Sequence, residues 1–270
     1  MVKKLVRSIV IYLAGILFLL PIIWVFSLSI RSKKDVFSAM FFVKDIHLEN
    51  YIVTWQTFNF SKLFLNSIFV TCVSVMITLV FSSLAAYAFS RIKYRGSNVF
   101  FYAILLGIMI PPAAVIIPLF LIMKTFGLYN SHLSLIFSYI AFGLPIAVLI
   151  FRGFFLSVPN ELIEAARIDG SSEVGTFFRI IIPLSKPAFA TVSIFLFMQN
   201  WNEFILALIL LKDKILYTLP VGMANFVGQW DSPWQLVAAG VIISSIPIFV
   251  VYLLIQDQFV KGLTAGAVKG

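Results

Sequence analysis

The sequence has little charge, a single cysteine and two histidines. Only 11% of its 270 residues are charged, whereas 61% are hydrophobic, and the mean hydropathy is +1.04. A soluble domain of this size needs a much larger share of polar surface. The lone Cys72 excludes a disulfide within the chain, and the widely separated His47 and His132 argue against a histidine-centred metal site. The composition therefore indicates a chain whose apolar surface meets lipid.

The sequence also lacks the short motifs of common catalytic sites. It contains no Gly-x-Ser-x-Gly, no His-Glu-x-x-His and no Gly-x-x-x-x-Gly-Lys-Ser/Thr phosphate-binding loop. We therefore expect a chain that is not an enzyme, that binds no metal or cofactor and that cannot hydrolyse ATP by itself. The net charge of +9 does not indicate nucleic-acid binding, because the basic residues lie at the ends of apolar runs and form no continuous footprint.

Six apolar runs are long enough to cross a bilayer, which takes about 20 apolar residues in a helix. They cover approximately residues 8–30, 63–89, 98–123, 133–156, 184–211 and 235–256. The sequence therefore predicts an all-α polytopic membrane protein with six transmembrane helices, a single transmembrane domain over residues 1–270. The first run follows basic residues, as in a signal peptide, but it is too long for a cleaved apolar segment, so we expect a retained first span.

The basic residues give the expected orientation. With a cytoplasmic N-terminus, the inner segments carry twelve of the 20 basic residues and the outer segments eight. The tight turn RIKYRGS at 91–97 is the clearest inner signal. We predict a multi-pass protein of the cell membrane with both termini in the cytoplasm.

Prolines interrupt several of the expected spans. They are Pro21, the group Pro111, Pro112 and Pro118, then Pro145, and Pro247. Each can be a packing kink or a bend that shapes a cavity or a hinge, and the sequence leaves both open.

The longest inner segment is the loop 157–183, SVPNELIEAARIDGSSEVGTFFRIIIP, called the long loop below. Its pattern predicts two short helices. Pro159 begins the first and Gly170 ends it, Ser171 or Ser172 starts the second, and Pro183 breaks the second before the fifth span. The first helix could lie on the membrane surface or insert into a groove of a partner protein, since it has no strong apolar stripe and is slim at its alanines.

The long loop resembles the EAA loop of importer-type ABC transporter permeases. That pattern is Glu-Ala-Ala, three residues, Gly, nine residues and Ile-x-Leu-Pro. It matches Glu164-Ala165-Ala166, then Gly170, then Ile180 and Pro183, with Ile182 in place of the usual Leu. The segments NWNEF (200–204), GQW (228–230) and the end QDQFVKGLTAGAVKG are similar to the carbohydrate-importing branch, in particular to the second permease of maltose-type systems.

The resemblance implies a type I ABC importer permease and a set of partners. These are a second permease in a heterodimer, two copies of a cytoplasmic ATPase that bind ATP and Mg, and an extracellular or periplasmic solute-binding protein. The docking residues would be Glu161, Glu164, Ala165, Ala166, Arg167, Asp169 and Gly170. The C-terminal tail, with Lys261, Gly262, Gly266 and Lys269, would also reach the ATPase pair, although composition alone would make it a frayed terminus.

Polar residues gather in the fifth expected span. They are Gln199, Asn200, Trp201, Asn202 and Glu203. Polar groups within a bilayer face a cavity or one another. These groups could bind a sugar on the translocation path or join helices to a partner permease, and the chemistry leaves both open.

The function that the sequence favours is the permease of an ATP-driven, binding-protein-dependent ABC importer. It would form half of the pathway for a carbohydrate and work by alternating access. A gradient-driven secondary carrier is the alternative, but the halves show no repeat and Glu203 is the only acid well inside a span. An intramembrane enzyme lacks a catalytic cluster. A non-sugar solute such as glycerol 3-phosphate also fits this resemblance.

Overall fold

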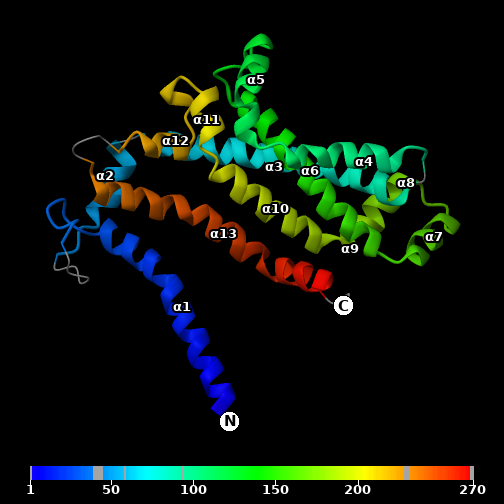
Figure 1. Ribbon diagram of the computed structural model, residues 1–270, viewed down its shortest axis with the longest axis horizontal. Coiled ribbons are helices and arrows are strands. Elements are labelled where there is room, and N and C mark those ends of the chain that lie inside the picture. Colours follow the sequence, from blue (N-terminus) through cyan, green and yellow to red (C-terminus); the bar gives the residue numbers. More distant parts are fainter. Residues whose placement is uncertain (1, 39–44, 58, 93, 228–231, 268–270) are drawn as a thin grey trace. The chain divides into compact units, whose positions relative to one another are not determined.

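The computed structural model describes residues 2–38, 45–57, 59–92, 94–227 and 232–267, and every regular element in these ranges is a helix (Figure 1). The all-α expectation is therefore confirmed. The chain divides into two compact units. One comprises Met1–Phe64 and Leu219–Pro247, and the other comprises Leu65–Thr218 and Ile248–Gly270.

Four helices of the described chain are long and apolar enough to cross a bilayer by themselves. They are α1 (Val2–Ser29), α3 (Phe60–Arg91), α6 (His132–Ser157) and α13 (Trp234–Ala267). Two bent pairs, Ser97–Met109 with Pro112–Thr125 and Glu173–Leu184 with Lys186–Trp201, raise the number of crossings to six if each pair counts as one. The six expected spans each correspond to one of these helices or pairs.

The first unit contains α1, α2 (Glu49–Thr57), the start of α3, α12 (Leu219–Ala224) and the first part of α13. The apolar stretch of α1 is not buried against protein, as expected for a helix that meets lipid. The Asn50 side chain of α2 donates to the carbonyls of Ser29 and Arg31 at 2.9 and 2.8 Å, which holds α2 to the end of α1. A Cβ on Gly222 would lie 2.2 Å from a Leu63 methyl carbon, so α12 reaches α3 only because this residue is glycine.

The second unit holds the rest of the chain between Leu65 and Thr218. Its further elements are α4 (Ser97–Leu105), the 3-10 turn η1 (Leu106–Met109), α5 (Pro112–Thr125), α7 (Asn160–Ile168), α8 (Glu173–Thr176), the π-helical turn η2 (Phe177–Ile181), α9 (Ile182–Leu184), α10 (Lys186–Trp201), α11 (Ile205–Leu210) and the 3-10 turn η3 (Lys214–Leu216).

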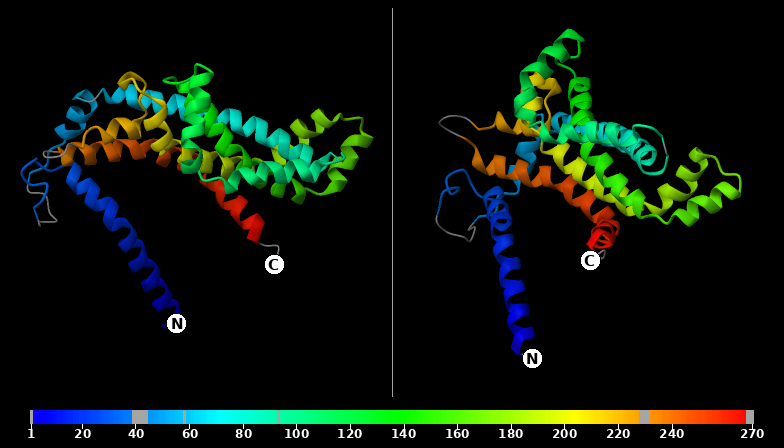
Figure 2. Two further views of the ribbon diagram at one scale, coloured as in Figure 1. Left: turned by 45° about the horizontal axis from the view of Figure 1, so that its top comes forward. Right: turned by 45° about the vertical axis from the view of Figure 1, so that its right-hand side comes forward.

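The centre of this unit is the packing of α6 against α10, which lie side by side in every view (Figure 1 and Figure 2). A Cβ on Gly143 of α6 would lie 2.8 Å from a methyl carbon of Leu196, so glycine permits this close approach. On α3, the buried hydroxyls of Ser74, Thr78 and Ser82 donate to carbonyls four residues earlier, which satisfies them inside the apolar interior.

The third expected span, 98–123, is broken rather than continuous. Its two parts meet at an angle of 102° around Ile110 and Pro111. Pro111 has an extended backbone and Pro112 is the first residue of α5. Two consecutive prolines remove two N–H donors, and a proline disfavours the helical conformation of the residue before it, so the helix cannot pass this point. The single prolines Pro118 and Pro145 stay inside helices.

The fifth expected span, 184–211, is also interrupted. The helix α10 ends at Trp201, and a second short helix begins at Ile205. Between them, the Glu203 carboxylate accepts hydrogen bonds from the backbone N–H groups of Leu206 and Ala207 at 2.7 and 3.1 Å. An acidic side chain that satisfies the first N–H groups of a helix fixes its start, so α11 begins anew here.

Candidate functional site

The first helix of the long loop, α7, begins and ends near the residues that the sequence indicated. Pro159 is its N-cap, and Gly170 follows its C-terminal end with a φ of +80°. Ser171 N–H donates to the Ala166 carbonyl at 2.9 Å, and Gly170 N–H donates to the Arg167 carbonyl at 3.0 Å. This pair of bonds is a Schellman motif, which requires the left-handed backbone that glycine adopts without strain.

The second helix of the loop is short and then changes its pitch. Ser172 caps α8, since its hydroxyl accepts from Gly175 N–H at 3.1 Å, as the sequence predicted for Ser171 or Ser172. The chain continues through η2 and α9, then bends by 76° before α10. This bend lies at Ser185 and not at Pro183. Pro183 is in the first turn of α9, where a missing N–H has little cost.

One face of α7 is buried and the other is open. Ile163 and Ala166 are buried at 4% and 7% exposure. The other residues expected to dock are exposed: Glu161, Glu164, Ala165, Arg167, Asp169 and Gly170. Ala166 therefore packs against the rest of the unit and is not on the open face. The exposed face also carries the apolar Leu162 and Ile168, which the sequence analysis did not single out.

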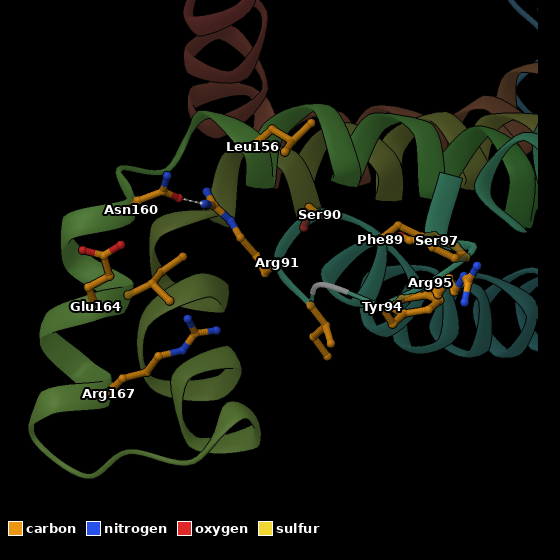
Figure 3. A pocket seen from close by; sticks show the side chains of 12 residues that line it. Phe89, Ser90, Arg91, Tyr94, Arg95, Ser97, Leu156, Asn160, Glu164 and Arg167 are labelled. Atoms are coloured by element: carbon orange, nitrogen blue, oxygen red, sulfur yellow. Dashed lines mark hydrogen bonds between the residues drawn. The ribbon is translucent and has the colours of Figure 1, made fainter. Parts of the chain in front are cut away.

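Arg91, the last residue of α3, holds the start of α7. Its guanidinium donates to the carbonyls of Phe155 and Val158 at the end of α6, and to the side-chain oxygen of Asn160 (Figure 3). The last carbonyls of a helix have no partner within it, so a cation there satisfies them and matches the helix dipole.

A second connection joins α3 to the end of α7. Tyr87 donates to Glu173 Oε2 at 2.8 Å, while Arg167 donates to Glu173 Oε1 from Nε at 3.0 Å and from Nη2 at 2.7 Å. The ring of Tyr87 also lies against that of Phe177, with their centroids 5.1 Å apart. Tyr87 and Glu173 were not among the predicted site residues, and their separation of 86 positions left no local signal.

A cleft of about 720 Å³ lies between α7 and the turn that follows α3. Asn160, Glu164 and Arg167 line it on the side of α7, and Tyr94 and Arg95 line it on the opposite side (Figure 3). Glu164 is exposed and makes no hydrogen bond or ion pair in the structure. Its carboxylate is therefore free to meet a group outside the chain.

The polar segment 199–203 at the end of α10 is only partly turned toward a cavity. Gln199, Asn200 and Glu203 line a cavity of about 220 Å³ together with Tyr139, whose hydroxyl donates to Glu203 at 2.9 Å. The rest of its lining is apolar, from α5, α6 and α11. Trp201 is instead buried at 3% exposure and stacks on Phe197, with ring centroids 5.6 Å apart.

The amides of this segment differ in their partners. Asn202 is exposed, and its Nδ2 donates to the Met198 carbonyl at 2.8 Å. Asn200 is 6% exposed, and its Nδ2 has no hydrogen-bond partner. A buried donor without a partner costs free energy, so its retention beside a cavity is unusual.

The predicted tail is described only in its backbone. Lys261, Gly262 and Gly266 lie within α13. Lys269 and the GQW segment at 228–230 lie outside the described residues. Among the residues that the structure describes, no three His, Cys, Asp or Glu side chains form a group that could hold a metal ion.

Three comparisons with known proteins agree with this architecture. The model of the family described as "Binding-protein-dependent transport system inner membrane component" matches residues 78–265. The trehalose transport system permease protein SugB of Mycobacterium tuberculosis is 37% identical over 254 residues, which is 93% of this chain and 93% of that protein. The trehalose/maltose transport system permease protein MalG of Thermococcus litoralis is 35% identical, over 99% of this chain and 98% of its own length.

A solved structure has the same fold over nearly the full length. It is a chain of a bacterial ABC transporter involved in the import of the acidic polysaccharide alginate, with 28% identity and a TM-score of 0.83, covering 96% of both chains. The helical architecture, the matched region and the identity to curated relatives together lead to one conclusion: the chain belongs to the binding-protein-dependent transport system inner membrane component family.

Proposed function

We propose that the chain is the permease subunit of an ATP-driven, binding-protein-dependent ABC importer and forms half of a translocation pathway for a carbohydrate. The observation that carries this proposal is α7, a short helix with an open, partly acidic face on a loop that is firmly attached to the transmembrane helices. The similarity to transport-system permeases named for trehalose and maltose supports the substrate class.

The open face of α7 is the surface on which an ATPase subunit docks. Glu161, Glu164 and Asp169 supply negative charge, and Leu162 and Ile168 supply apolar contact. A helix with this mixture suits a groove of a partner protein better than a membrane surface, which would require a continuous apolar stripe. Arg167 contributes less to docking, since Glu173 already occupies its guanidinium.

The transport cycle is alternating access driven by the partner subunits. Two ATPases bind ATP and Mg and close on each other. The permease loops docked on them then move toward each other, and ATP hydrolysis reverses this movement. A switch of this kind from 1:99 to 99:1 takes roughly 5.5 kcal/mol of differential interaction. The chain itself is non-catalytic and binds no cofactor, and its C-terminal tail at Lys261, Gly262, Gly266 and Lys269 adds a further contact with the ATPase pair.

The substrate path runs past the cavity at Gln199, Asn200 and Glu203. Its volume of about 220 Å³ is below the roughly 300 Å³ of an ordinary ligand pocket. This size suits a half-site that a second permease completes. The amide groups and the Tyr139 ring beside apolar walls supply the hydrogen bonds and the stacking surface that a sugar requires. Trp201 and Asn202 do not line the cavity.

The protein lies in the cell membrane with both termini in the cytoplasm. This orientation puts the long loop on the side where ATP is available. A solute-binding protein then delivers the substrate to the opposite face.

Reconstitution into proteoliposomes tests this function. The second permease, the ATPase and the binding protein are included. Uptake of a radiolabelled oligosaccharide should require ATP on the side of the membrane that carries the ATPase subunits, and it should persist when ion gradients are collapsed. Uptake that follows an ion gradient without ATP would instead identify a secondary carrier.

Charge reversal tests the docking surface. Glu164→Lys should abolish co-purification of the ATPase and reduce uptake at least about tenfold, since a charged contact at a buried interface contributes about 2 kcal/mol or more. Asp45→Lys is the matched control, because Asp45 is an exposed acid in the first expected outer loop. Equal effects of both variants would rule out α7 as the docking helix.

A further inference from the structure

The last turn of α3 presents two side chains to the long loop. Tyr87 and Arg91 are four residues apart, so they lie on the same face of the helix. Both reach residues more than 60 positions away in the sequence.

Arg91 fixes the end of the loop where α7 starts. Its guanidinium bridges three acceptors, the Phe155 and Val158 carbonyls and the Asn160 side chain. Phe155 and Val158 belong to the last turn and the C-cap of α6, while Asn160 is the first residue of α7. A planar, rigid guanidinium holds several acceptors in one geometry, which a lysine cannot reproduce.

Tyr87 fixes the other end. Its hydroxyl holds Glu173, and Glu173 holds Arg167 in the last turn of α7 by two bonds. Hydrogen bonds to a charged group are stronger than neutral ones. Between the two ends, Ile163 and Ala166 are buried, so α7 is attached to the unit along its length.

The two covalent connections of α7 differ. On its N-terminal side only Val158 and Pro159 separate it from α6. On its C-terminal side the chain passes through the π-helical turn η2 and a bend of 76° before it reaches α10. The π-helical turn is a local interruption of the regular helix, and such turns are often found at functional sites. Tyr87 and Arg91 connect α3 to both ends of α7 without passing through either covalent connection.

We infer that Tyr87 and Arg91 are positioning residues that transmit ATPase-driven displacement of α7 to the transmembrane helix α3. This inference rests on the proposed function. It adds that the two side chains at the end of α3, which are not part of the docking face, determine how much transport each hydrolysed ATP produces.

The experiment compares Tyr87→Phe and Arg91→Lys with the unaltered transporter, assembled with its partner subunits in proteoliposomes. Tyr87→Phe removes only the hydroxyl and keeps the ring against Phe177. Three quantities are measured: ATPase co-purification, ATP hydrolysis, and substrate transported per ATP. Arg7→Ala is the matched control, since Arg7 lies on α1, is exposed and makes no hydrogen bond or ion pair in the structure.

We expect both variants to keep the ATPase bound and ATP hydrolysis intact, while substrate transported per ATP falls about fivefold, the lower range of a typical coupling free energy. Arg7→Ala should leave the ratio unchanged. An unchanged ratio in Tyr87→Phe, or a fall in hydrolysis that matches the fall in transport, overturns the inference. Loss of ATP dependence in the unaltered transporter would instead refute the proposed function, so the two failures are distinguishable.

Discussion

The second unit contains two polar clusters that are built in different ways. In the loop cluster (Tyr87, Arg91, Arg167 and Glu173) the bonds from α3 join residues 64 to 86 positions apart. In the segment 199–203, Glu203 and Asn202 bond mainly to backbone groups three or four residues away. The exception is Tyr139, 64 positions from Glu203.

The loop cluster holds separate elements together, whereas the bonds of the segment 199–203 shape one stretch of chain. Long-range bonds attach the loop to α3. Local bonds in the segment 199–203 end one helix and start another, and they leave Asn200 beside a cavity without a partner. The first cluster therefore joins two elements, and the second leaves polar groups facing a cavity. Four substitutions test this contrast.

Arg91→Ala should have the largest effect on local stability. It leaves two carbonyls at the end of α6 without their donor, at a cost of about 3 kcal/mol for opening of the loop. Hydrogen exchange of the purified transporter should show faster exchange in α7 and unchanged exchange in α10. Equal protection of α7 in both proteins would show that Arg91 does not hold the loop.

Glu203→Ala should destabilise the other cluster by about 2 kcal/mol. It removes the acceptor for two N–H groups of α11 and leaves the Tyr139 hydroxyl without its partner. Thermal unfolding in detergent measures this change. Glu203→Gln keeps one acceptor oxygen, so its thermal stability should lie between those of Glu203→Ala and the unaltered protein. If Glu203→Ala retains full thermal stability but loses transport, Glu203 serves the substrate and not the helix start.

Gly170→Ala should cost about 1 kcal/mol, because its φ of +80° is strained for a residue with a Cβ even though nothing lies within 4 Å of that position. The matched variant is Gly170→Asn, since asparagine tolerates the left-handed region better. Proteolysis at the end of α7 should increase in the order glycine, asparagine, alanine. A different order would mean that this turn does not limit the opening of the loop.

Asn200→Leu should change stability least, by about 1 kcal/mol or less and in the stabilising direction. It removes a buried donor that has no partner. Transport should nevertheless fall if the amide serves the substrate. A variant that is destabilised together with reduced transport would place Asn200 in helix packing instead.

Local patterns in the sequence predicted much of this molecule. The stop at Gly170 and the cap at Ser172 depend on nearby residues only, and the structure has both. Of the six apolar runs, four correspond to single long helices and two to bent pairs. The links from Tyr87 to Glu173 and from Arg91 to Asn160 could not be predicted, because they depend on which helices pack together. In the sequence, Arg91 indicated only which side of the membrane the turn 91–97 faces.

Local breaks were harder to predict than the helices themselves. Proline alone is a poor guide, since Pro118, Pro145 and Pro247 stay within helices while Pro111 and Pro112 end one. The break after Trp201 has no proline at all. A polar residue in a span, such as Glu203, can be a helix cap as well as a ligand group, and only the position of its acceptor atoms distinguishes these roles.

The proline break has a consequence for how the protein is made. Ser97–Met109 contains thirteen residues, nine in α4 and four in η1, and is roughly 20 Å long. This is shorter than the roughly 30 Å of a bilayer interior, so neither this segment nor the 14-residue α5 crosses alone. Non-helical backbone within a bilayer needs protein around it, and Gly107 of η1 packs closely on Pro145 of α6. We therefore expect the ribosome-bound chain to complete this crossing only after α6 has emerged to receive it.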